Sequence, residues 1–179
     1  GFAHTHLSAT GIGDLGDILF MPATGPVKVK KGTAKDLQSG YASLFSHKNE
    51  TTRPGYYRVL LDRYNIHATL TASNRVGYHM YRFLDGGDGH IVIDLEEGIS
   101  DAPTATHIRQ VNDSTVEGYR FSRGWARDQR IYFTAVFSKR ITRFNVYEDS
   151  LQKQGKEFTG TRTKGVVFFN TGEDRMVDV

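Results

Sequence analysis

Two histidines flank a threonine close to the start of the chain, in His4-Thr5-His6. Alternate side chains of an extended backbone point to the same face, so His4 and His6 would project together. Such a pair can supply two ligands to zinc or iron, or can hydrogen-bond a ligand or a neighbouring domain. A metal site needs a third ligand, and none follows at a diagnostic spacing. We therefore favour hydrogen bonding over metal binding.

Hydroxyl and carboxylate side chains continue the same segment as far as Asp17. Ser8 follows His6 closely, but no nucleophile-elbow pattern surrounds it, so a catalytic serine is not indicated. Asp14 and Asp17 lie among glycines and could bind calcium or act as an acid–base pair. Aspartate and glycine together are also typical of turns. We favour the turn.

Two other acidic segments have similar alternatives. Glu96-Glu97 and Asp101 follow a predicted strand, but neighbouring strand residues face opposite ways, which favours a solvated edge over a glycosidase carboxylate pair. The Asp85–Gly89 loop lacks the carboxylate spacing of a calcium loop. We therefore predict that it is a hairpin turn.

The single tryptophan, Trp125, lies in the run Gly124–Gln129 beside Arg127 and Asp128. An indole next to polar groups can stack on a sugar ring while its neighbours bind hydroxyls. It can equally be a core residue beside a surface ion pair. The residues alone leave both interpretations open.

The composition indicates one globular domain. The 179 residues are 38% hydrophobic and 12% aromatic, which fits a chain with a core. The net charge of +3 comes from interspersed charges, which argues against nucleic acid as a partner. The lack of cysteine excludes disulfides and thiolate metal sites. No apolar run reaches the ~18 residues that would predict a membrane span.

Alternating apolar and polar residues predict strands along most of the chain. The clearest are Tyr57–Leu61, Ile66–Ala72, Arg75–Phe83, Ile91–Leu95, His107–Val111, Thr115–Phe121, Ile131–Phe137, Ile141–Tyr147 and Gly165–Phe169. Both faces of Ile131–Phe137 are apolar, which predicts a central, covered strand. Spacing from Leu37 to Phe45 predicts one short helix. The expected fold is all-β, an antiparallel β-sandwich with little helix, as a single domain over residues 1–179.

Several runs, taken in order, resemble the N-terminal β-sandwich domain of glycoside hydrolase family 92, the calcium-dependent, exo-acting α-mannosidases. The resemblance rests on Gly1–Gly11, Gly13–Ile18, Phe45–Glu50, Pro54–Tyr57, Leu70–His79 and Val111–Tyr119. It covers most of the chain and implies a supersandwich-like fold.

The chain departs from the family pattern in three respects. Ala9 stands where members usually carry glycine, and Lys48 where they carry glutamate. The family's sandwich also begins upstream of Gly1 and continues beyond Val179. An incomplete sandwich exposes unpaired strand edges, so we expect this chain to be part of a longer protein.

The resemblance implies that catalysis occurs in a second, C-terminal (α/α)₆ domain. Its carboxylates would hydrolyse an α-mannoside glycan with inversion, at an α-1,2-type linkage, and its Ca²⁺ would contact sugar hydroxyls. The present chain would contribute no catalytic residue and no metal ligand, and would instead pack on that domain and wall the mannose pocket. The residues expected at the substrate or the domain interface are His4, His6, Ser8, Thr10 and Trp125. A periplasmic or secreted location is the family expectation.

Two alternatives come from other classes of protein. The chain could be a free-standing carbohydrate-binding β-sandwich module, with Trp125 and tyrosines as the stacking surface. It could also be a small metalloenzyme whose metal is held by histidines on a β-barrel.

Overall fold

The computed structural model describes residues 1–6, 11, 13, 15–33 and 35–179. Within these ranges the chain forms fourteen strands and two 3₁₀ turns, η1 (Leu37–Ser39) and η2 (His47–Asn49), and all strand pairs are antiparallel. The central sheet has the order β1 (Leu19–Thr24), β6 (Asp88–Asp94), β13 (Thr163–Asn170), β10 (Arg143–Glu148) and β11 (Leu151–Lys153).

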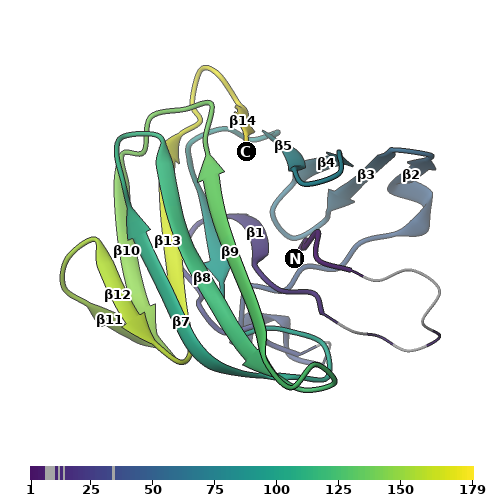
Figure 1. Ribbon diagram of the computed structural model, residues 1–179. Helices are drawn as coiled ribbons and strands as arrows, with labels where there is room; N and C mark the ends of the chain where they lie inside the picture. The colour runs from purple at the N-terminus through teal and green to yellow at the C-terminus, as the bar shows by residue number, and fades with distance from the viewer. Residues whose placement is uncertain (7–10, 12, 14, 34) are drawn as a thin grey trace.

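Two further sheets pack on the central sheet. The front sheet has the order β12 (Glu157–Gly160), β7 (Ala102–Gln110), β8 (Thr115–Arg123) and β9 (Gln129–Val136). The side sheet has the order β14 (Met176–Asp178), β5 (Gly77–Phe83), β4 (Ile66–Ala72), β3 (Tyr56–Leu61) and β2 (Glu50–Arg53). Figure 1 shows β7, β8 and β9 in front of β13, with β2 to β5 on the right.

One face of the central sheet contacts both of the other sheets. Phe20, Ile93 and Gly165 lie directly opposite one another on neighbouring strands, so they share a face. A Cβ atom added to Gly165 would lie 2.5 Å from Ile108 of β7. The Phe20 ring centroid lies 5.3 Å from that of His79 in β5. The predicted sandwich is therefore confirmed, with two sheets side by side on one face of a third.

The opposite face of the central sheet is covered by the chain between β1 and β2. Val29 and Tyr41 from this segment are buried, and the Tyr41 hydroxyl donates to Asp94 at 2.9 Å. His90 and Phe168 lie directly opposite each other on β6 and β13 and face the same way. This cover is a loop segment and not a sheet.

The Asp85–Gly89 segment is not the predicted hairpin turn. It leads from β5 of the side sheet to β6 of the central sheet, and these strands do not pair with each other. Gly86 and Gly87 have φ angles of 70° and 93°, a region that favours glycine. The glycines thus mark a change of direction, which by itself does not specify which strands pair.

Two other predictions about the elements were wrong. The Ile131–Phe137 strand exists as β9, but it is an edge strand of the front sheet, and its outward Tyr132 and Val136 are 68% and 59% exposed. The predicted helix over Leu37 to Phe45 is only the turn η1, because the chain becomes extended at Gly40. No described helix is long and apolar enough to cross a membrane.

Candidate functional site

A fully buried arginine on β8 joins the start of the chain to the sandwich. The Arg120 side chain is 0% exposed and donates to both carboxylate oxygens of Asp101, at 2.7 and 2.8 Å. It also donates to the buried carboxylate of Asp17, and its Nε donates to the Leu95 carbonyl at 3.0 Å. One guanidinium therefore holds the N-terminal segment and the connection from β6 to β7 together.

The charges in this cluster stabilise one another. Burial alone would lower the pKa of Arg120, but the hydrogen bonds and charges of Asp101 and Asp17 outweigh burial and raise that pKa. Burial likewise opposes ionisation of Asp101, yet its hydrogen bonds to Arg120 lower the pKa of the carboxyl. Arg120 and Asp101 are thus ionised at neutral pH, and they form an ion pair with each other.

These contacts correct two predictions made for acidic residues. Asp17 is not an exposed turn residue but a buried partner of Arg120, and Asp14 lies outside the described residues. Glu96 and Asp101 do not form a solvated edge, because Glu96 is ion-paired with the buried Lys164. Glu97 pairs with the exposed Lys31 at 2.8 Å.

The threonine between the two N-terminal histidines belongs to the same network. The Asp17 backbone N–H donates to Thr5 Oγ1 at 2.7 Å, and the Gly16 N–H donates to the Thr5 carbonyl at 2.8 Å. On the other side, Gln129 Nε2 donates to Asp17 Oδ2 at 2.8 Å. Thr5 is therefore fixed, which restricts where the neighbouring imidazoles can lie.

His4 packs against the side sheet. Its ring centroid lies 4.6 Å from that of His79, which is only 3% exposed. Gly77 makes this approach possible, because a Cβ there would lie 2.2 Å from His4 Cδ2. Burial, with the charge of His4, lowers the pKa of His79 to about 3, and burial lowers the pKa of His4. Both rings are neutral at pH 7 and can each donate and accept one hydrogen bond.

The predicted site residues divide into three groups. His4 and His6 are both exposed while Thr5 is half-buried, which agrees with the expected alternation. Ser8 and Thr10 lie outside the described residues. Trp125 is 73% exposed, so the interpretation as a core tryptophan was wrong.

Trp125 and the N-terminal segment line the same small hollow. The loop between β8 and β9 places Trp125 beside a small hollow of about 30 Å³ that Leu15, Ile99 and Gln129 also line. Leu15 and Ile99 form an isolated antiparallel bridge. Gln129 in turn contacts Asp17, so the histidine-bearing segment and the tryptophan loop are anchored to the same buried cluster.

The described part of the chain offers no metal centre. It contains no group of three or more histidine, cysteine, aspartate or glutamate side chains placed to hold an ion. The rings of His4 and His79 contact each other at an interplanar angle of 40°, with their centroids 4.6 Å apart. A metal held by His4 and His6 gains no third ligand from these residues.

Arg120, the residue at the centre of the site, was missed by the sequence analysis. The signal was present in the alternation of β8, where Val116, Gly118, Arg120 and Ser122 all occupy the buried face. A charged residue on an otherwise apolar or small-residue face indicates a buried ion pair. Its partners could not be read from this pattern.

Comparison with known proteins gives a consistent set of similarities. The family model described as the glycosyl hydrolase family 92 N-terminal domain matches residues 1–179. A solved family GH92 α-mannosidase of Bacteroides thetaiotaomicron is 34% identical, with a TM-score of 0.92 over 99% of this chain. The GH92 family glycosyl hydrolase ccman5 is 26% identical, with a TM-score of 0.82 over 99% of this chain.

A third structure shows the fold alone. It is an inverting GH92 mannosidase of Bacteroides thetaiotaomicron VPI-5482, 17% identical with a TM-score of 0.71. The present chain spans only 26%, 25% and 25% of the lengths of these three proteins. No match was found among curated proteins.

Proposed function

Because this chain belongs to the N-terminal domains of glycosyl hydrolase family 92, we propose that it is the sandwich part of an exo-acting, inverting α-1,2-type mannosidase. In this proposal the sandwich packs on an (α/α)₆ catalytic domain and forms part of the wall of the mannose pocket. The supporting observation is the match over the whole chain to proteins about four times as long, one of them named an α-mannosidase. The enzyme would be periplasmic or secreted.

The chemistry of the described carboxylates supports a separate catalytic domain. An inverting glycosidase needs an acid and a base whose carboxyl groups are roughly 6.5–9.5 Å apart, with space for water between them. Asp17 and Asp101 share a single guanidinium and are sequestered from solvent. Held by Arg120, these two carboxylates are not free to protonate a glycosidic oxygen or to activate water, which supports placing the acid and the base in the other domain.

Calcium is part of the proposal only for that other domain. Ca²⁺ prefers six to eight oxygen ligands, and the described residues contain no suitable cluster. When bound in the catalytic domain, the ion would hold sugar hydroxyls in place.

The role that we propose for this chain is to present fixed polar and aromatic groups to the sugar or the partner domain. Thr5 fixes the backbone between His4 and His6, and the neutral imidazole of His4 can both donate to and accept from a hydroxyl. Trp125 presents an exposed ring that could stack on a pyranose. Ser8 and Thr10 belong to the same proposed surface by their place in the sequence.

The decisive experiment compares the 179-residue chain with a protein that also contains the helical domain. We expect the longer protein to hydrolyse α-1,2-mannobiose, to release the β-anomer first, and to lose activity with a calcium chelator. The chain alone should hydrolyse none. Turnover by the isolated chain would disprove the division of labour.

The pocket-wall role needs its own test in the longer protein. We expect Trp125→Ala and His4→Ala to raise KM or lower kcat. Tyr132→Ala, which removes an equally exposed ring from the outer face of the front sheet, should leave both unchanged. Equal effects of Trp125→Ala and Tyr132→Ala would argue against a pocket role for Trp125.

The second candidate function is a carbohydrate-binding module, which the exposure of Trp125 favours. It requires measurable binding of mannan by the 179-residue chain and loss of that binding in Trp125→Ala. Failure of the chain to bind mannan would remove this second candidate and leave only the proposed role in a mannosidase.

A further inference from the structure

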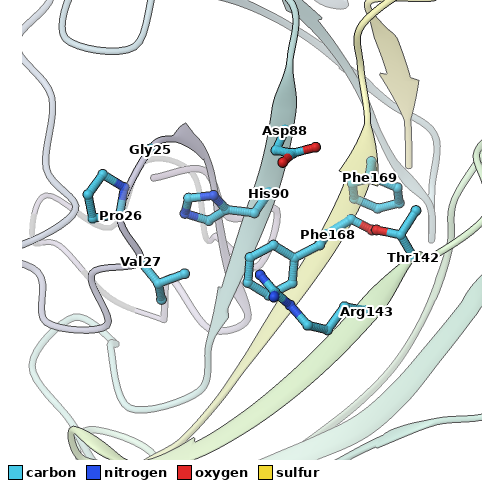
Figure 2. A pocket seen from close by; sticks show the side chains of 9 residues that line it. All are labelled: Gly25, Pro26, Val27, Asp88, His90, Thr142, Arg143, Phe168 and Phe169. Carbon is cyan, nitrogen blue, oxygen red and sulfur yellow. The ribbon is translucent and has the colours of Figure 1, made fainter.

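A second hollow lies on the face of the central sheet that the β1–β2 connection covers, away from Trp125 and the N-terminal histidines. Its volume is about 610 Å³, within the ~300–1,000 Å³ typical of small-molecule sites. Strands β6, β10 and β13 line one side, and the chain at Gly25–Val27 lines the other (Figure 2). The residues that matter for binding are Asp88, His90, Arg143 and Phe168, with Pro26 and Val27 opposite.

His90 is buried but has no protein partner for hydrogen bonding within the described residues. The residue is 2% exposed, and its imidazole points from β6 toward Gly25–Val27 (Figure 2). Burial, with the charge of Arg143, lowers the pKa of His90 to about 4, so the ring is neutral at pH 7. Across residues 1–6, 11, 13, 15–33 and 35–179, no group hydrogen-bonds either ring nitrogen. A neutral imidazole therefore offers one donor and one acceptor to the hollow.

The two charged groups of the hollow also lack ion-pair partners within the described ranges. The Arg143 guanidinium carbon lies 3.8 Å from the centroid of the Phe168 ring, so the cation is supported by an aromatic face and not by a carboxylate. Asp88 forms no ion pair with any described residue. A neighbouring hollow on the same sheet face differs, because Lys31 pairs there with Glu97 and Lys164 with Glu96.

We propose that this hollow is a non-catalytic binding site for a neutral saccharide. Sugar hydroxyls both donate and accept, so one pyranose can satisfy the Asp88 carboxylate, the Arg143 guanidinium and the neutral His90 together. The apolar side of the ring can pack on Pro26 and Val27. An anion would be attracted by the Arg143 guanidinium but repelled by the Asp88 carboxylate, and this repulsion disfavours its binding.

This proposal does not depend on the mannosidase proposal, because it concerns another face of the sheet and requires no catalytic domain. It is tested on the 179-residue chain by two-dimensional amide NMR, with methyl α-mannopyranoside as the probe and inorganic phosphate as the comparison. We expect saturable shifts at Gly25, Gly89 and Arg143 with the mannoside, and weaker or no shifts with phosphate. Tighter binding of phosphate would overturn the assignment to a neutral saccharide.

Two variants test which groups bind. His90→Phe keeps a ring of similar size but removes both nitrogens, and Arg143→Met keeps an apolar cover over Phe168 but removes the charge. Each should weaken mannoside binding by about tenfold or more, since hydrogen bonds to charged or buried groups are lost. The amide spectrum of each variant first shows that it is folded.

Arg130→Met is the matched control. Arg130 also lies over an aromatic ring, that of Phe121 at 5.4 Å, but on the front sheet. It should bind the mannoside as the parent chain does. Unchanged affinity in both hollow variants, or shifts confined to the Trp125 loop, would overturn the proposal, as would an absence of any saturable shift.

Discussion

The guanidinium of Arg120 contacts the carboxylate of Asp17 across 103 positions of sequence, and both side chains are fully buried. The N-terminal segment therefore contributes a buried charged side chain to the interior of the sandwich and does not pack only on its surface. Its carboxylate neutralises a charge that the front sheet carries on its inner face. The segment that carries the candidate histidines and the fold of the sandwich thus depend on each other.

Removing the central cation should destabilise the whole domain. We expect Arg120→Met to lower the free energy of unfolding by about 3–5 kcal/mol, because Asp17 and Asp101 become buried carboxylates without a counter-charge. Urea denaturation followed by circular dichroism measures this change.

The control for that variant is Arg109→Met. Arg109 also pairs with a carboxylate, Glu117, but the two side chains are 48% and 33% exposed. Exposed pairs contribute about 0–1 kcal/mol, so this substitution should cost far less. Equal losses in the two variants would show that the Arg120 cluster is not a structural centre.

The stability of the domain should fall as the pH is lowered from about 6.5 toward 4. The pKa of His90 is about 4 in the folded chain, whereas a histidine in the unfolded chain keeps its ordinary value of about 6.5, so the unfolded chain binds more protons in this window. Each such histidine gives a slope of about 1.4 kcal/mol per pH unit. The pKa of His79, about 3, acts in the same direction, whereas that of Asp94, about 6, acts in the opposite one.

His90→Phe isolates the contribution of one histidine. The slope of unfolding free energy against pH between 4 and 6.5 should become shallower by up to about 1.4 kcal/mol per pH unit, while the contributions of His79 and Asp94 cancel in the comparison. Urea unfolding at a series of pH values measures both slopes. Identical slopes would mean that His90 is not held neutral.

Gly77→Ala should displace His4 without unfolding the chain. The added methyl group would occupy the place of the His4 ring, which is exposed and can move, and Gly77 has no positive φ that would strain alanine. We expect a stability change below about 1 kcal/mol. The shift of the His4 ring resonances in NMR would report its displacement.

In the longer enzyme, Gly77→Ala should reproduce the kinetic effect of His4→Ala if the position of this imidazole matters. Normal kinetics with a displaced His4 ring would remove that residue from the proposed pocket wall.

Removal of divalent metal should affect catalysis and not the sandwich. We expect the thermal midpoint of the 179-residue chain to be the same with and without a chelator, because its described residues form no cluster suited to an ion. Differential scanning calorimetry gives this comparison. A chelator-dependent drop in the midpoint would indicate a metal site within this chain.

Much of the local structure could be predicted from the sequence. The alternation in Ile66–Ala72 and Thr115–Phe121 corresponds to strands β4 and β8, and the many alternating segments predicted an all-β fold. The family resemblance gave the architecture, which the structural neighbours confirm. The candidate site was predicted only in part, since the alternation placed His4 and His6 on one face but did not give their exposure or their surroundings.

Only the tertiary structure decided which strands pair and which charges meet. The glycines of Asp85–Gly89 indicated a turn but not a crossing between sheets, and the apolar faces of Ile131–Phe137 indicated a strand but not its place at an edge. Arg120 was visible as a charge on a buried face, while its partners come from positions 17 and 101. The physical reason is range: periodicity reports on neighbours along one strand, whereas burial and ion pairing are set by residues that only folding brings together.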